Sequence, residues 1–179
     1  MIKQRAGAFL SNSDRFSESL MIVKELGFDP SSFLFCSALA NIVSNDKSKW
    51  EEKMELYMSF GWSEDDIVSA FKKQPQIMAT SKEKITRMMD FFLNESRWGL
   101  SFVSRYPNIL LFSLEKTIIP RYSVTRVLMS HGLLKRDVNL HTVCHMKEEK
   151  FLEKYVIHEK VPQVIQAYKG KISTGVAHI

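Results

Sequence analysis

The stretch FKKQPQIMATSKEKI, residues 71–85, sets the architecture of this chain, because an altered copy of it occurs at positions 103–117. Pro75 corresponds to Pro107, and the pair Glu83-Lys84 corresponds to Glu115-Lys116. A period of about 32–35 residues is typical of stacked helical units, none of which can bury its apolar face alone. The repeated stretch therefore predicts a repeat protein.

Two further markers follow a compatible period. A weaker third copy ends in Glu149-Lys150, one period after Glu115-Lys116, and has His141 near the position of the proline. Gly27 and Gly61 are also one period apart, and each follows an apolar helical run. The tetrapeptide MSFG that ends at Gly61 recurs as MSHG two periods later. These markers indicate about four repeats.

Each repeat is predicted to contain a long helix that ends at a glycine and a short helix that ends at a proline turn. No apolar and polar alternation typical of strands is sustained, so the fold class is an all-α solenoid. Asp29 and Pro30 are read as the start of the second helix, which is apolar nearly all round and should form a buried layer. Pro120 lies within the run 114–130, so that helix must be kinked or must begin later. The other predicted helices are 17–26, 31–43, 49–60, 64–73, 82–93, 100–103, 138–143, 148–157 and 162–168.

The repeat array is expected over residues 17–169, between a flexible N-terminus (1–16) and a flexible tail (170–179). The N-terminal sequence, MIKQRAGAFLSNSDRF, lacks the apolar core of a secretory signal. It is basic, contains serine and has no acid before Asp14, which permits a short organelle transit segment. A truncated or frayed start is the alternative.

The composition is that of a folded protein, with 45% apolar and 25% charged residues. No apolar run approaches the length of a membrane helix. Cys36 and Cys144 lie in different repeats and form no disulfide framework, so both are expected to be small buried residues.

The net charge of +5 is concentrated in the C-terminal third. Residues 1–60 carry seven basic and eight acidic side chains, residues 61–120 carry eight and seven, and residues 121–179 carry ten and five. A basic C-terminal third fits a polyanionic partner, although a solvated basic surface would give the same count.

The segment LYMSFGWSEDDIVSAFKKQPQIMATSKEKI, residues 56–85, resembles the repeat of the mitochondrial transcription termination factor (MTERF) family. The shared marks are the helix that ends in glycine, the Ser-capped short helix with Asp66-Ile67, the Pro-x-Ile-Met/Leu turn and the Ser-x-Glu-Lys start of the next helix. The resemblance covers residues 18–170, and the close EEKFLEKYV resembles that of plant members. The first and fourth repeats lack the proline, and the third lacks the glycine.

The resemblance implies a right-handed, half-doughnut superhelix that acts in a chloroplast or mitochondrion. Such a protein would bind double-stranded DNA, and sometimes RNA, along a basic concave face, as a monomer without a cofactor. It would act in transcription termination or related RNA metabolism. The chain has fewer repeats than typical members, and fewer repeats mean fewer phosphate contacts.

Solenoids can hold a duplex by presenting basic side chains to its phosphates at a regular spacing. Arg87 and Arg121 are separated by about one period and are interpreted as equivalent positions of successive repeats. The predicted nucleic-acid contacts, which cluster around the proline turns, are Lys72, Lys73, Lys84, Arg87, Arg105, Lys116, Arg121, Arg126, Lys135 and Arg136. Lys82 belongs to the same cluster.

Other kinds of site are not predicted. His141, Cys144 and His145 complete no four-ligand zinc set of known spacing, so no metal site is expected. The sequence has no phosphate-binding glycine loop, no nucleophile elbow and no clear carboxylate pair, so an enzyme is not expected. The aromatic residues Trp50, Tyr57, Phe71, Phe91 and Phe92 are interpreted as core rather than as base-stacking groups.

Two alternatives to nucleic-acid binding stay open from the sequence. One is a helical-repeat scaffold that binds another protein, and the other is a decayed paralogue without retained binding. The character of the concave surface distinguishes these hypotheses. A nucleic-acid-binding protein would have a basic concave surface, whereas a protein scaffold would have an apolar one with few charges.

Overall fold

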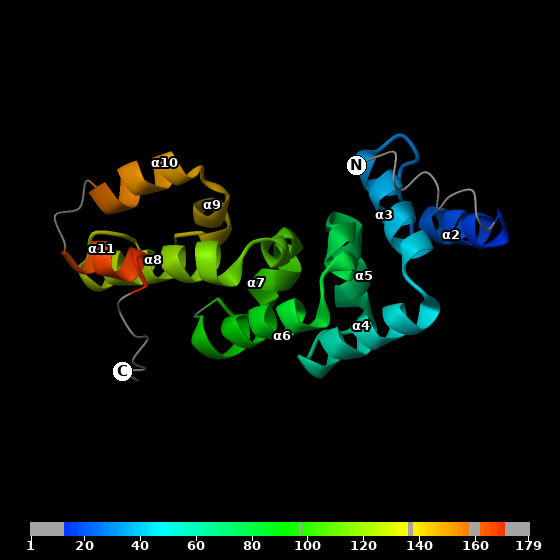
Figure 1. Cartoon of the computed structure of the whole chain (residues 1–179), viewed down its shortest axis with the longest axis horizontal. Coiled ribbons are helices and arrows are strands. Elements are labelled where there is room, and N and C mark those ends of the chain that lie inside the picture. Colours follow the sequence, from blue (N-terminus) through cyan, green and yellow to red (C-terminus); the bar gives the residue numbers. More distant parts are fainter. Residues whose placement is uncertain (1–12, 97, 136–137, 158–161, 171–179) are drawn as a thin grey trace. The chain divides into compact units, whose positions relative to one another are not determined.

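A computed structural model describes residues 13–96, 98–135, 138–157 and 162–170 (Figure 1). Every regular element in these ranges is a helix and no strand occurs among them, which confirms the expected all-α fold. No described helix is long and apolar enough to cross a membrane. The terminal segments 1–12 and 171–179, which include most of the candidate transit segment, lie outside the described residues.

The first repeat is a helical hairpin made of α2 (Ser13–Glu25) and α3 (Phe33–Ser44). Residues 13–16, expected to be flexible, already belong to α2. The N-cap of α3 is Ser32, which accepts a hydrogen bond from the Phe35 amide, whereas Asp29 accepts from Ser31 in the preceding turn. The expected cap at Asp29 was therefore wrong, and the helix begins after Ser32 instead.

The second repeat contains α4 (Lys47–Ser59), α5 (Glu64–Lys73) and the 3₁₀ turn η1 (Pro75–Ala79). The bounds of α5 are those that the sequence predicts, since Ser63 begins it and Pro75 disfavours helical geometry at Gln74. Gly61 has φ +95°, a left-handed conformation that side chains rarely adopt, and its amide closes the end of α4 on the Met58 carbonyl. Local chemistry therefore sets both ends of this repeat.

The start of α5 gives a first prediction about stability. The Ser63 hydroxyl accepts from the Asp66 amide, and the Asp66 carboxylate accepts from both the hydroxyl and the amide of Ser63. The hydrogen bond from the Ser63 hydroxyl, followed by the one from its amide, lowers the Asp66 pKa. Ser63→Ala is expected to lower the free energy of unfolding by about 1 kcal/mol in urea denaturation. The contribution of Asp66 should be present above its ordinary pKa of 3.8 and lost as pH falls through the lowered value. Asp66→Asn should reduce the loss of unfolding free energy at acidic pH. If this loss were the same in Asp66→Asn as in the unchanged chain, the prediction would be wrong.

The third repeat contains α6 (Lys82–Asp90), the π-helical turn η2 (Phe91–Glu95), α7 (Gly99–Arg105) and the 3₁₀ turn η3 (Pro107–Leu111). Ser81 caps α6 by accepting from the Lys84 amide, as the sequence predicts. The long helix ends in a wide turn rather than at a glycine, in agreement with the missing glycine of this repeat.

The structure of the fourth repeat shows how Pro120 is accommodated within the predicted helix 114–130. A π-helical turn comes first, in which the Ile118 amide reaches the Ser113 carbonyl, and Pro120 then occupies the first turn of a new α-helix. A proline is tolerated there because the first amides of a helix need no partner within it. The elements of this repeat and the chain after it are η4 (Leu114–Ile118), α8 (Ile119–Ser130), α9 (Leu140–His145), α10 (Glu148–Phe151), η5 (Leu152–Ile157) and α11 (Pro162–Tyr168).

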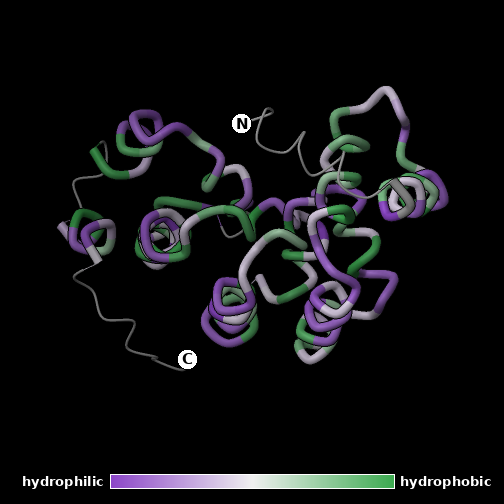
Figure 2. Tube along the Cα trace, turned by 45° about the vertical axis from the view of Figure 1, so that its right-hand side comes forward, coloured by the Kyte–Doolittle hydropathy of each residue, from purple (hydrophilic) through white to green (hydrophobic). Residues whose placement is uncertain are grey.

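The chain divides into two compact parts, Met1–Leu111 and Phe112–Ile179. In the first, η1 packs against α3, α5 and η3, and Ile77, Phe71 and Met88 are fully buried. In the second, α8 packs against α11, and Val124 and Phe151 are buried. Within each part, apolar and hydrophilic positions alternate along the helices (Figure 2). The two parts contain the first three repeats and the fourth repeat, respectively.

The predicted core aromatics are largely confirmed. Tyr57, Phe71, Phe91 and Phe92 are buried, while Trp50 is half-buried with its ring 5.0 Å from that of Phe71. The four buried rings are therefore not available to stack on bases.

The prediction that α3 is a buried layer is wrong for one side of the helix. Phe33 is 78% exposed and Cys36 is exposed too, so only Cys144 of the two cysteines is buried as expected.

Candidate nucleic-acid interface

Two of the predicted residues occupy equivalent positions in successive repeats. Lys73 ends α5 and Arg105 ends α7 of the next repeat, and both side chains are exposed. The Lys73 ammonium donates to the carbonyl of Ser104 over 3.2 Å, which places the last turns of the two helices side by side. With Lys72, they form what we call the basic ridge: Lys72, Lys73 and Arg105.

The sequence places the cations of the basic ridge at helix ends for a local reason. Each short helix stops just before its proline turn, so its last carbonyls have no partner within the helix. Cations are favourable there because the helix dipole is negative at that end. The Arg105 guanidinium also lies over the Tyr106 ring, 5.5 Å from its centre, which restricts its position. The ridge thus presents positive charge at the end of the short helix in the second and the third repeat.

Other predicted cations are exposed on separate elements. Arg87 lies on α6, while Lys116 lies in the π-helical turn η4. Arg126 lies on α8 with its guanidinium 5.6 Å from the centre of the Tyr122 ring, and Lys135 follows that helix. Arg136 lies outside the described residues.

Lys82 is held by a carboxylate. Its ammonium is 2.6 Å from Glu52 of α4, and this pairing raises the Lys82 pKa and lowers that of Glu52. Both side chains are about half exposed, at 52% and 51%, so the pair should contribute little to stability. A phosphate at Lys82 would have to compete with Glu52.

Arg121 was predicted to contact nucleic acid, and the structure contradicts this. The residue is only 5% exposed, and its guanidinium donates to the carbonyls of Val143, Cys144 and Met146 over 2.7–2.9 Å. It also pairs with Glu148 at 2.7 Å. These contacts use the guanidinium inside the fold, so a phosphate has no access to it.

The error came from the choice of register. The period that relates Pro75 to Pro107 pairs Arg121 with Met89, which is fully buried, and not with Arg87. Arg121 thus occupies a core position of the long helix. Its guanidinium lies 4.8 Å from the centre of the buried Phe151 ring, as a core side chain would.

The Lys84 side chain also binds to the main chain of the protein itself. Its half-buried ammonium donates to the Leu111 carbonyl over 2.9 Å, and burial lowers its pKa. Its repeat equivalent, Lys116, is exposed, so a match in sequence does not give a match in environment. Lys84 is therefore removed from the candidate phosphate contacts.

The contacts of Arg121 and Lys84 belong to a recurring feature that the sequence reasoning missed. In every repeat, a basic residue of the long helix donates to a main-chain carbonyl at the end of the short helix or turn that follows. We call this contact the carbonyl clasp. The donor and acceptor pairs are Arg15 and Asn45, Lys53 and Met78, Lys84 and Leu111, and Arg121 with Val143, Cys144 and Met146.

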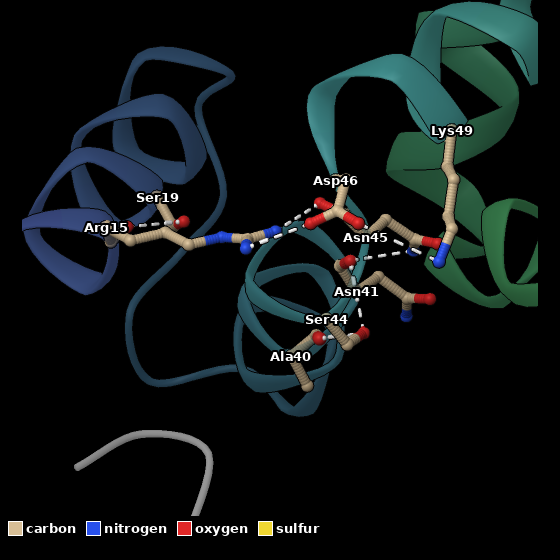
Figure 3. A network of polar contacts seen from close by, with 8 residues as sticks. All are labelled: Arg15, Ser19, Ala40, Asn41, Ser44, Asn45, Asp46 and Lys49. Atoms are coloured by element: carbon tan, nitrogen blue, oxygen red, sulfur yellow. Dashed lines mark hydrogen bonds and ion pairs between the residues drawn. The ribbon is translucent and has the colours of Figure 1, made fainter. Parts of the chain in front are cut away.

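Figure 3 shows the clasp of the first repeat, where Arg15 reaches from α2 to the Asn45 carbonyl at 2.7 Å. The same guanidinium pairs with Asp46 at 3.1 Å. The clasp satisfies carbonyls that a helix leaves without a partner at its C-terminal end. In the sequence, the carbonyl clasp is marked only by a basic residue some 22–30 positions before a turn. Such residues are too common to identify the clasp.

Titratable side chains do not gather into a metal site in the described part of the chain. No group of three His, Cys, Asp or Glu side chains is placed to hold an ion there. The His141 and His145 rings are tilted by 39° to one another with their centres 4.0 Å apart, and the Nδ1 atom of His145 lies 2.8 Å from the His141 carbonyl oxygen. Burial raises the pKa of Cys144 to about 12, so its thiol stays protonated and is a poor ligand.

Comparison with known proteins gives a consistent family. The mTERF family model matches residues 1–152. A protein of Drosophila melanogaster named as a mitochondrial transcription termination factor is 30% identical over 107 residues, which are 59% of this chain and 25% of that protein. Two mitochondrial transcription termination factors of Arabidopsis thaliana are 24% and 21% identical over 105 and 113 residues.

The matched regions span only about a quarter or less of these relatives, between 20% and 25% of their lengths. No solved structure matches the chain.

Proposed function

The chain belongs to the mTERF family, and we propose that it binds double-stranded nucleic acid and regulates gene expression in an organelle. Its relatives are named as mitochondrial transcription termination factors, which favours the mitochondrion over the chloroplast and termination over other steps. The chain acts by binding rather than by catalysis. The partner is duplex DNA, with RNA as the second candidate, and the chain binds it as a monomer.

The observation that carries the proposal is the basic ridge. Lys73 and Arg105 are exposed at equivalent positions of two repeats, which is how a repeat protein can follow a regular row of phosphates. Arg87 is a further exposed cation in the same compact part, and Lys116, Arg126 and Lys135 are exposed in the other. Contacts of this kind give affinity without sequence preference, and they weaken as salt rises.

Removing two cations of the basic ridge should change the salt dependence of binding. The double variant K73A/R105A is expected to lower duplex affinity by a similar factor for all sequences. It should also reduce the slope of log K against log salt by about 2, since each lost phosphate contact contributes about 1. Fluorescence anisotropy with a labelled duplex at several salt concentrations measures both quantities, with duplex RNA in parallel.

The double variant K24A/K47A is a matched control, because it removes two exposed lysines far from the ridge in sequence. It should bind as the unchanged chain does. An absence of duplex binding at low salt would refute the proposed function. Equal slopes for K73A/R105A and the unchanged chain would refute the ridge as its site.

A further inference from the structure

The carbonyl clasp of the third repeat lies close in the chain to a cation of the basic ridge. Lys84 of α6 donates to the Leu111 carbonyl at the end of η3 over 2.9 Å. Arg105 is the last residue of α7 and lies two positions before Pro107, where η3 begins. The turn η3 therefore follows a ridge cation and ends at a clasped carbonyl.

The second repeat has the same arrangement. Lys53 of α4 donates to the Met78 carbonyl in η1, and Lys73 ends α5 two positions before Pro75, where η1 begins. The turns η1 and η3 pack against each other within the N-terminal compact part. Each of these two ridge cations thus precedes a turn that a half-buried lysine of the long helix holds.

A series of contacts connects the clasped turn η3 with the Arg105 side chain. The Arg105 guanidinium lies over the Tyr106 ring, 5.5 Å from its centre. The Tyr106 amide donates to the Phe102 carbonyl of α7, and the Tyr106 carbonyl accepts from the Ile109 amide of η3, both over 3.0 Å. The ring that Arg105 covers is therefore tied to the main chain of η3, whose end Lys84 holds.

The separation of the two cations matters for binding. A basic side chain binds a phosphate well only while it stays within hydrogen-bond distance of the phosphate oxygens. The Lys73 ammonium donates to the Ser104 carbonyl over 3.2 Å, so the ends of α5 and α7 are neighbours. Lys84 makes no phosphate contact itself, because its half-buried ammonium, whose pKa burial lowers, is engaged with Leu111.

We propose that Lys84 is a positioning residue of the basic ridge. By holding the end of η3, it keeps the end of α7 in place, so that Arg105 and Lys73 contact phosphates of the same duplex at a fixed separation. This inference rests on the proposed function, because it takes these two cations as phosphate contacts. It adds that a side chain without a phosphate contact determines whether one of them is effective.

The variant Lys84→Met tests the proposal, because methionine keeps a straight apolar stem and removes the donor. Duplex binding is followed by fluorescence anisotropy at several salt concentrations, alone and in combination with R105A or K73A. K84M should reduce the slope of log K against log salt by about 1, the contribution of the lost Arg105 contact. Adding R105A should then change the slope no further, whereas adding K73A should reduce it by about 1 more.

Two further variants control for charge and for the donor. Lys84→Arg keeps both, and arginine is the clasp donor in the first and fourth repeats, so this variant should bind as the unchanged chain does. Lys24→Met removes one exposed lysine of α2 and should leave the slope unchanged. Circular dichroism should show all three single variants folded, since each replacement is similar in length to lysine.

Three binding results would overturn the proposal. Additive slope changes for K84M and R105A would mean that Lys84 contacts a phosphate directly. A K84M variant in which K73A also has no further effect would mean that the whole ridge had loosened. A K84M variant that binds as K24M does would mean that the clasp does not act on the ridge.

Hydrogen exchange tests the same turn without a duplex. In K84M, the amides of Tyr106 and Ile109 should exchange several-fold faster, while those of Ile77 and Thr80 in and after η1 should keep their rates. Unchanged exchange at Ile109 would overturn the proposal even if the chain binds duplex. Faster exchange in a chain that binds no duplex at low salt would instead refute the proposed function, so the two failures are distinguishable.

Discussion

Replacing Arg121 by alanine is expected to lower the free energy of unfolding by about 3–5 kcal/mol, the range found when one partner of a buried charged contact is removed. The guanidinium is 5% exposed and donates to three carbonyls at the end of α9. Without it, these carbonyls lose their donor in a place that water reaches poorly. The fold of the C-terminal part should therefore weaken around α8 and α9.

Glu148→Gln is the matched control for Arg121→Ala. The Glu148 side chain is 52% exposed, and half-solvated ion pairs contribute about 0–1 kcal/mol. Urea denaturation followed by circular dichroism should separate the two variants clearly. Hydrogen exchange should show faster exchange of the α8 and α9 amides in Arg121→Ala. Equal stability of the two variants would mean that the carbonyl contacts contribute little.

Phe71→Ala is expected to destabilise the N-terminal part by about 3–5 kcal/mol, the usual cost of truncating a buried phenylalanine. The ring is fully buried and meets Phe28 and Trp50 edge to face, with centres 5.8 Å and 5.0 Å away. Its removal would leave a cavity between α5 and the elements that these rings belong to. The residues that follow Phe71 are Lys72 and Lys73, so the same change should loosen the basic ridge.

Phe33→Ala provides the comparison, because that side chain is 78% exposed and its loss should change stability by no more than about 0.5 kcal/mol. Urea unfolding monitored by tryptophan fluorescence measures both variants, since Trp50 adjoins the Phe71 ring. If Phe71→Ala cost no more than Phe33→Ala, the packing of α5 described above would be incorrect.

The sequence predicted the helices well because the signals that set their ends are local. Ser63 and Pro75 bound α5 at the expected residues, and Gly61 ends α4 as expected. Pro120 predicted a kink or a later start of its helix, and the structure shows a π-helical turn followed by a new helix. Where two residues could each cap the start of a helix, as Asp29 and Ser32 could for α3, the predicted start was wrong by only a few residues.

The candidate site was predicted less well. Arg105 and Arg121 look alike in the sequence, yet one guanidinium is exposed and the other is buried. The apolar sequence of α3 predicted a buried helix, but nothing in the described part of the chain covers Phe33. In both cases, the environment of a side chain was inferred from its neighbours in sequence.

By itself, the sequence determined the fold class, the repeat and the places where helices begin and end. These follow from backbone constraints of single residues, such as a proline without an amide hydrogen or a glycine at positive φ. Only the tertiary structure decided which cations face water. A basic side chain is drawn inward when a helix end elsewhere in the repeat leaves carbonyls without partners. For Arg121 and Lys84 those carbonyls lie more than twenty positions further along the chain, beyond the reach of any local pattern.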